Sequence, residues 1–472
     1  MPARSLAIAD LAAAYREGRT TPRQIVRATY ERVAAARNRG IWISLLPLER
    51  ALEQAEALGA CDPTTQPLYG IPFAVKDNMD LAGLPTTAAC PAFAYSPQES
   101  AFAVSRLIKA GAIPIGKTNL DQFATGLVGT RSPYGACHNS FDPEFISGGS
   151  SAGSAVAVAT GLVSFALGTD TAGSGRVPAA FNNLVGMKPS CGRLSIRGIV
   201  PACRTLDTVA ILALTAEDAA RVCSVAQGFD EEDPYSRRIA PPRRRVPWAR
   251  GPFRFGVPRS EQLQFFGNEE YPRLFDAAVI QLQGLGGQPV RIDLAPFTEA
   301  GCLLYEGSWL AERYIVVEAV LRGARDALLP VTRQIIESGA TLTATAAIHA
   351  EYRLQALRRA CEHVWNDIDV LVTPTAGTIY RISAVEAEPV RLNTNLGYYT
   401  YFMNLLDLAG VAVPVGFTRA GLPFGMTLVG PAWSDFDLLA LASRVQHQPI
   451  ARLGAQELAL PEEHDFTWDT AS

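Results

Sequence analysis

Two short segments rich in glycine and serine could carry nucleophilic chemistry. One is SGGSSAGS, which begins at Ser147, and the other is GTDTAGSGR, which begins at Gly168. Small residues around a serine leave room for a substrate, and successive backbone N–H groups can hold the negative charge of an attacked carbonyl. A glycine-rich structural loop is the alternative interpretation of either segment alone. Neither segment matches the phosphate-binding pattern GxxxxGK[ST] or the GxSxG nucleophile turn.

A serine nucleophile needs a group that takes its proton, and the histidines are poorly placed to do so. They lie outside both segments and show no metal-ligand spacing, at positions 138, 349, 363, 447 and 464. Lys76, in AVKDN, is the candidate base, because burial lowers the pKa of a lysine and a neutral amine accepts a proton. Lys117, in IGKTN, is a rival lysine. The eight cysteines, including Cys191 and Cys203, are expected to pack rather than to react.

The combined pattern AVKDN, SGGSSAGSA and GTDTAGSGRVPAAFNNLVGMKPS resembles the amidase signature family of amide hydrolases, which use a Ser-Ser-Lys triad. The resemblance implies Ser174 as the nucleophile, Ser150 as the proton-relaying serine and Lys76 as the base. It also implies a cis peptide bond at Ser150. The oxyanion hole would be made of the backbone N–H groups of Thr171, Ala172, Gly173 and Ser174.

The residue before Gly173 narrows the expected substrate, because Ala172 stands where common family members have a second glycine. This variant, together with LLYEGSWLAERY and LNTNLGYYTYFMNLLDLAGVAVPVGF, resembles the allophanate hydrolase branch of the family. That branch releases ammonia and N-carboxycarbamate from allophanate (urea-1-carboxylate) in urea and s-triazine nitrogen breakdown. The full-length enzymes usually continue into a C-terminal domain that handles the product. Since this chain ends at Ser472, we expect that domain to be absent.

The resemblance implies that Tyr305 and Arg313 bind the carboxylate of the substrate. Eight residues apart on one helix, they would be offset by about 80° and would share one broad side. Gly126 is expected to add a backbone contact. Asp170, Arg176 and Asp207 are expected to hold the loops by hydrogen bonds rather than to take part in the chemistry.

Three other functions fit parts of the pattern. One is an amidase for another small acid amide, such as malonamate or a carboxybiuret. Another is a glutaminase-like subunit of a tRNA amidotransferase, which normally carries the two-glycine form. The last is a non-catalytic binding protein on the same fold, which the joint presence of Lys76, Ser150 and Ser174 disfavours.

Composition and patterning place these residues in a globular α/β protein. Of 472 residues, 48% are hydrophobic and 19% charged, with a net charge of −4, which disfavours disorder and a general nucleic-acid binder. Alternating strand and helix patterns predict a mixed β-sheet, and the resemblance implies the amidase signature fold with helices on both faces. The predicted regions are an N-terminal helical region (1–60), an amidase domain (61–445) with a Pro/Arg-rich surface excursion (229–258), and a C-terminal tail (446–472).

The expected partner is a small anionic amide, with no metal and no organic cofactor. Residues 145–169 are nearly free of charge, but their many glycines and serines favour a buried segment over a membrane span. No secretory signal is recognised at the start, so a cytoplasmic enzyme with no membrane or nucleic-acid partner is expected. The resemblance implies a homodimer, with a dimer contact in the N-terminal region.

Overall fold

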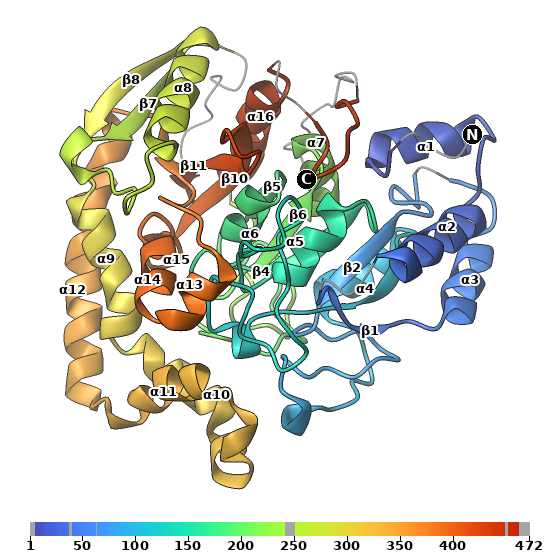
Figure 1. The fold of residues 1–472 in the computed structure, drawn as a ribbon, viewed down its shortest axis with the longest axis horizontal. Helices are drawn as coiled ribbons and strands as arrows, with labels where there is room; N and C mark the ends of the chain where they lie inside the picture. The colour runs from blue at the N-terminus through green and yellow to red at the C-terminus, as the bar shows by residue number, and fades with distance from the viewer. Residues whose placement is uncertain (1–4, 37–39, 63, 241–250, 449–451, 462–472) are drawn as a thin grey trace.

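The computed structural model describes residues 5–36, 40–62, 64–240, 251–448 and 452–461. Within them, eleven strands form one sheet in the order β1-β3-β2-β4-β6-β5-β10-β11-β9-β7-β8 (Figure 1). The strands are β1 (Trp42–Leu45), β2 (Pro72–Lys76), β3 (Ile113–Thr118), β4 (Phe165–Thr169), β5 (Val185–Lys188), β6 (Val209–Ala213), β7 (Phe253–Pro258), β8 (Gly287–Ile292), β9 (Val370–Pro374), β10 (Leu408–Phe417) and β11 (Pro423–Pro431).

The α-helices of the described residues lie before, between and after these strands along the chain, singly or in runs of up to four. They are α1 (Ile8–Arg16), α2 (Pro22–Ala35), α3 (Leu48–Ala57), α4 (Phe102–Lys109), α5 (Ala152–Ala159), α6 (Arg176–Phe181), α7 (Ala216–Ala226), α8 (Tyr271–Gly284), α9 (Ala295–Glu306), α10 (Trp309–Gly323), α11 (Pro330–Glu337), α12 (Ala344–Glu362), α13 (Ile382–Ala387), α14 (Arg391–Leu396), α15 (Phe402–Leu405) and α16 (Asp435–Gln446).

The sheet is mixed, as the sequence predicts. Strand β2 runs parallel to both of its neighbours, β3 and β4, and β7 runs parallel to β8 and β9. The strands between these two parallel groups pair antiparallel. Strands β2, β4, β6 and β9 are buried along their whole length, which matches their largely apolar sequences.

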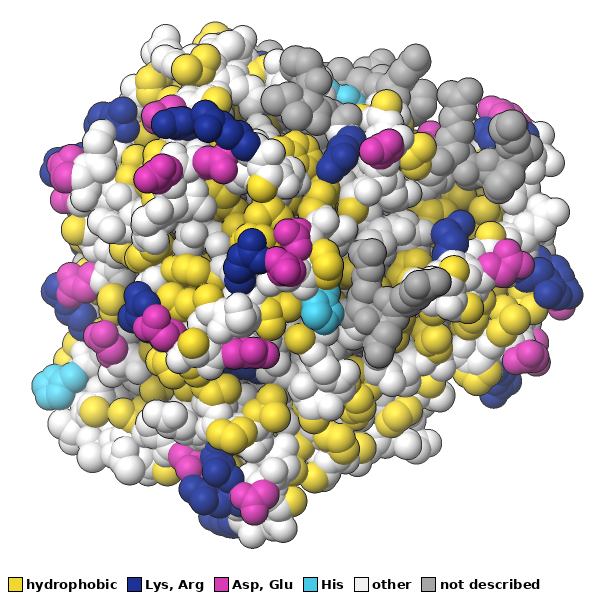
Figure 2. Space-filling view, viewed as in Figure 1, with side chains coloured by type: hydrophobic (Ala, Val, Ile, Leu, Met, Phe, Trp, Pro, Cys, Tyr) yellow, Lys and Arg dark blue, Asp and Glu magenta, His cyan; other side chains and the backbone are white. Residues whose placement is uncertain are grey.

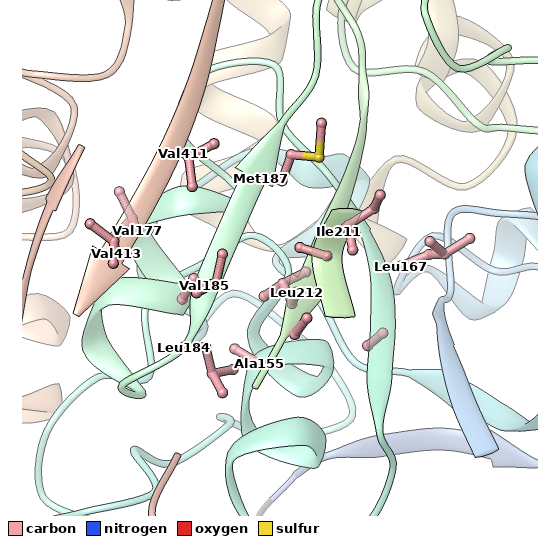
Figure 3. Close-up of a cluster of buried hydrophobic side chains, with 14 of the residues drawn as sticks. Ala155, Leu167, Val177, Leu184, Val185, Met187, Ile211, Leu212, Val411 and Val413 are labelled. Carbon is pink, nitrogen blue, oxygen red and sulfur yellow. The ribbon is translucent and has the colours of Figure 1, made fainter. Parts of the chain in front are cut away.

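Helices cover the middle of the sheet in two separate groups. Helices α5 and α6 contact each other, and helices α7 and α16 contact each other. Both groups also contact the central strands of the sheet. Figure 3 shows the apolar layer beneath the first group, where Ala155 of α5 and Val177 of α6 lie with side chains from β5, β6 and β10.

The N-terminal region departs from the prediction of helices alone. Strand β1 lies within it and pairs antiparallel with β3, at one edge of the sheet. Helix α2 begins at a reciprocal cap, because the Thr21 side chain accepts a hydrogen bond from the Gln24 N–H and Gln24 Oε1 accepts one from the Thr21 N–H.

The excursion predicted over 229–258 is not wholly at the surface. Asp230 and Asp233 are buried, and both accept hydrogen bonds from Ser195 Oγ. Strand β7 also belongs to this stretch, while residues 241–250 lie outside the described residues. The described part of the C-terminal tail packs on the body, because Asn183 Nδ2 donates to the carbonyls of Arg452 and Gly454, each at 2.9 Å.

The visible surface carries charges of both signs. On the face drawn in Figure 2, the described Lys and Arg side chains are interspersed with Asp and Glu. Among the described residues, every helix is too short or too polar to cross a lipid bilayer. The same residues contain no group of three or more His, Cys, Asp or Glu side chains that could hold a metal ion.

Candidate active site

Lys76 is the last residue of β2, and Thr169 is the last residue of the neighbouring parallel strand β4. Parallel strands bring their carboxyl ends to one edge, and Lys76 Nζ lies 2.7 Å from Thr169 Oγ1 and 2.7 Å from Ser150 Oγ. Lys76 is fully buried and forms no ion pair with a described carboxylate. Burial lowers the pKa of Lys76 to about 7, so near neutral pH much of this lysine is a neutral amine.

Ser150 lies in the loop that leads into α5. The Gly149–Ser150 peptide bond is cis, as the family resemblance implies. The next residue joins this loop to the nucleophile loop, because the Ser151 N–H donates to the Ser174 carbonyl at 3.2 Å. The Ser151 hydroxyl also donates to the Thr169 carbonyl at 3.2 Å. The structure therefore places Lys76 against Ser150 and joins the backbone of the Ser150 loop to that of the Ser174 loop, from three separate parts of the chain.

Ser174 lies in the tight loop between β4 and α6, and Asp170 organises that loop. The Asp170 carboxylate accepts hydrogen bonds from the backbone N–H groups of Gly173 at 2.7 Å and Gly175 at 3.1 Å. It also forms a buried ion pair with Arg176 at 2.9 Å. Burial alone would raise the pKa of Asp170, but Arg176, Lys188 and the Gly173 N–H together hold it below its usual value. The predicted structural role of Asp170 and Arg176 is confirmed.

The backbone N–H groups around Ser174 differ in whether they already donate a hydrogen bond. The Gly173 N–H is occupied by Asp170, whereas those of Thr171, Ala172 and Ser174 have no hydrogen-bond acceptor among the described residues. Three of the four groups expected to form an oxyanion hole are thus free to bind a developing negative charge.

Two further side chains brace the nucleophile loop. Asp207 accepts a hydrogen bond from Thr171 Oγ1 and others from the N–H groups of Ala202 and Cys203. This confirms its predicted structural role. Thr400 Oγ1 donates to the Ala172 carbonyl at 2.7 Å. Gly173 has a φ of +118°, and a Cβ there would lie 2.4 Å from Thr400 Oγ1, so the loop has no space for a side chain at this position.

The rival lysine has a different partner, and the two cysteines nearest in sequence to the Ser174 loop have raised pKa values. Lys117 pairs with Asp77 at 3.2 Å and donates to Thr86 Oγ1 at 3.0 Å. Burial raises the pKa of Cys191, and it raises that of Cys203 to about 12, which keeps both side chains as thiols.

Tyr305 and Arg313 come together, but not on one helix. Helix α9 ends at Glu306 and α10 begins at Trp309, with Gly307 in an extended conformation between them. The 80° argument for a shared helix side is therefore wrong, because it extended a helix through a glycine that ends it. The two residues meet across the junction of α9 and α10, with the Arg313 guanidinium carbon 5.6 Å from the centre of the Tyr305 ring.

Arg313 is a buried cation without a carboxylate partner. Its side chain is 2% exposed. Nη1 donates to Thr125 Oγ1 at 3.1 Å and to the Ala124 carbonyl at 3.4 Å, and Nε has no partner. It forms no ion pair with a described carboxylate, although a buried charge is costly unless it is paired. The unpaired guanidinium makes this region suited to an anionic ligand. Gly126 directly follows Thr125 in the same loop.

Three contacts of the site were missed by the sequence reasoning. Thr169 touches Lys76, Thr400 touches the nucleophile loop, and the ring of Tyr401 lies 5.1 Å from that of Tyr305. Thr400 and Tyr401 belong to LNTNLGYYTYFMN, a stretch that carries the resemblance, but no local pattern there identifies which side chain faces the site.

Comparison with known proteins decides the family. The sequence model of the Amidase family matches residues 24–439. The chain belongs to the amidase family. It is 45% identical over 414 residues to urea amidolyase of Saccharomyces cerevisiae, an alignment that covers 85% of this chain and 22% of that protein. The chain thus spans about a fifth of the length of that relative.

Other amidase-family proteins match over nearly the whole chain. A glutamyl-tRNA(Gln) amidotransferase subunit of Oleidesulfovibrio alaskensis is 32% identical, with 94% of this chain and 98% of that protein covered. The solved structure of Kluyveromyces lactis allophanate hydrolase superposes with a TM-score of 0.89 and 41% identity, over 95% of this chain and 74% of that one. These amidase-family relatives identify an amide-hydrolysing enzyme, and the alternative of a non-catalytic binding protein is set aside.

Proposed function

We propose that this amidase hydrolyses allophanate, with Ser174 as nucleophile, Ser150 as proton relay and Lys76 as base. The observation that carries the proposal is the buried Arg313, which has no carboxylate partner among the described residues. A substrate that brings its own carboxylate would complete this site. The 41% identity to Kluyveromyces lactis allophanate hydrolase supports the same substrate.

The proposed first step is attack of Ser174 Oγ on the terminal amide carbonyl of allophanate. The Ser174 proton passes to Ser150 as the Ser150 proton passes to neutral Lys76 along the 2.7 Å contact. The free N–H groups near Ser174 stabilise the negative oxygen. The relay then returns the proton to the amide nitrogen, the C–N bond breaks, and ammonia leaves.

The proposed second step is hydrolysis of the acyl-enzyme. Water attacks the ester carbonyl of the carboxycarbamoyl group on Ser174 and gives its proton to the same relay. The Ser174–acyl bond breaks, Ser174 recovers its proton, and N-carboxycarbamate is released. Throughout, Tyr305 and Arg313 would hold the carboxylate of the substrate, with Gly126 contributing a backbone contact.

This account predicts that Ser174 becomes more reactive as the pH rises through 7. Because the pKa of Lys76 is about 7, the amine is protonated and unable to accept a proton at lower pH. The second-order rate constant for labelling Ser174 with a small neutral fluorophosphonate should fall about tenfold per unit below pH 6 and level off above pH 8. A rate that stays flat between pH 5.5 and 8.5 would contradict this role of Lys76.

The substrate is tested by ammonia release from purified protein given allophanate, malonamate or biuret. Biuret has an amide where allophanate has its carboxylate, so we expect its kcat/KM to be at least about 100-fold lower. Equal turnover of biuret would overturn the carboxylate assignment. Preferred turnover of malonamate would keep the triad and change the substrate.

We also propose that the protein is a cytoplasmic homodimer with a dimer contact in its N-terminal region. The proposed division of the chain is an N-terminal region, an amidase domain and a C-terminal tail. Family resemblance supports the dimer. Light scattering coupled to size-exclusion chromatography should give twice the mass of the chain, and a monomeric mass would contradict it.

A further inference from the structure

One short segment of the chain contacts both halves of the proposed site. Thr400 Oγ1 donates to the Ala172 carbonyl, and Arg176 Nη2 donates to the Thr400 carbonyl at 3.2 Å. The next residue, Tyr401, is 7% exposed and places its ring 5.1 Å from that of Tyr305. Consecutive residues therefore brace the nucleophile loop and the carboxylate-binding side.

The position of the Tyr401 ring is closely constrained. A Cβ at Gly397 would overlap this ring, so the glycine makes the space that the ring fills. The Tyr401 hydroxyl lies 3.4 Å from both the carbonyl and the side-chain Nδ2 of Asn393. These contacts come from helix α14 and from the turn that follows it, and Tyr305 contacts the Tyr401 ring as well.

Asn393 extends these contacts to the loop that holds Arg313. Asn393 Oδ1 accepts a hydrogen bond from the Leu127 N–H at 2.7 Å. Two residues earlier in that loop, Thr125 Oγ1 accepts the hydrogen bond from Arg313. A continuous path thus runs from Tyr305 through Tyr401 and Asn393 to the loop beside Arg313.

We propose that Tyr401 is a positioning residue for the carboxylate site, which fixes the Tyr305 ring and, through Asn393, the loop that holds Arg313. Because Thr400 is anchored to the nucleophile loop, this arrangement sets the distance between Ser174 and the bound carboxylate. It selects acid amides in which one atom separates the amide carbonyl from the carboxylate. The inference rests on the proposed function and adds a specificity-determining residue to it.

The test compares Tyr401→Phe with Tyr399→Phe. Tyr399 is a matched control, since it is also buried and its hydroxyl accepts a hydrogen bond from the Gln264 N–H at 2.6 Å and donates to the Gln264 carbonyl at 3.1 Å. In Tyr401→Phe we expect the KM for allophanate to rise about threefold to tenfold, with kcat within about twofold of the native value. Tyr399→Phe should leave both constants unchanged, even if it unfolds at a lower temperature.

A second measurement reports on the anion site without turnover. Malonamate should slow the labelling of Ser174 by a neutral fluorophosphonate, and the concentration that halves the rate should rise about threefold to tenfold in Tyr401→Phe only. Unchanged protection and KM in Tyr401→Phe, or equal changes in Tyr399→Phe, would overturn the positioning role. If the native enzyme releases no ammonia from allophanate while the protection still shifts in Tyr401→Phe only, the proposed substrate is wrong and the positioning role stands.

Discussion

Replacing Lys76 with methionine should lower the turnover of allophanate by about 10⁴-fold or more, close to the effect of Ser174→Ala. When several residues act as one catalytic unit, the enzyme loses nearly the same activity whichever of them is removed. Lys76 Nζ is buried 2.7 Å from Ser150 Oγ, and methionine fills similar space but cannot accept a proton. Steady-state ammonia release measures the loss.

Lys117→Met is the matched control for this variant. Lys117 is equally buried but pairs with Asp77, so its replacement should cost about 3 to 5 kcal/mol of folding free energy by leaving a buried carboxylate unpaired. Circular dichroism gives the fraction of the variant that is folded. The kcat per folded enzyme should stay within about tenfold of the native value. A Lys76→Met enzyme with more than a tenth of the native kcat would exclude Lys76 as the base.

Replacing Arg313 with methionine should lower kcat/KM for allophanate by about 100-fold to 1,000-fold. The guanidinium is the buried cation of the site, and loss of one partner of a buried charged contact costs about 2 to 5 kcal/mol. Most of the loss should appear as a higher KM, since the carboxylate is held before and during the reaction alike. The kcat/KM for biuret, which lacks the carboxylate, should change by less than about threefold.

Arg322→Met is the control for Arg313→Met, because Arg322 lies on the same helix α10 but is exposed and pairs with Glu318. This variant should have native kinetics with both substrates. Equal losses for allophanate and biuret in Arg313→Met would mean that Arg313 supports the fold rather than the carboxylate.

The positions of Lys76 and of the loop that carries Ser174 could be anticipated because the local sequence sets each of them. Lys76 ends an apolar strand, and Ser174 lies in a loop that Asp170 and Arg176 hold from within the same nine residues. Tyr305 and Arg313 were identified correctly as neighbours but for the wrong reason. Gly307 ends helix α9 between them, and the contact depends on how two helices meet.

Other features depend on contacts distant in sequence. The role of Thr400 at the nucleophile loop and the position of Tyr401 against Tyr305 follow from packing of segments nearly a hundred residues or more apart. Strand β1 was missed because it is a four-residue strand at the sheet edge. The acidic residues Asp230 and Asp233 suggested exposure, yet Arg197 pairs with Asp230 and the Ile196 N–H donates to Asp233, which compensates their burial.

The central claim is that Ser174 attacks the terminal amide of allophanate while the carboxylate lies at Arg313. Allophanate carrying ¹⁵N only in its terminal amide tests this orientation in a single turnover with enzyme in excess. The account predicts that the first equivalent of ammonia is ¹⁵N-labelled, before the released N-carboxycarbamate breaks down. Unlabelled ammonia in that first equivalent, or an equal mixture of both isotopes, would contradict the account.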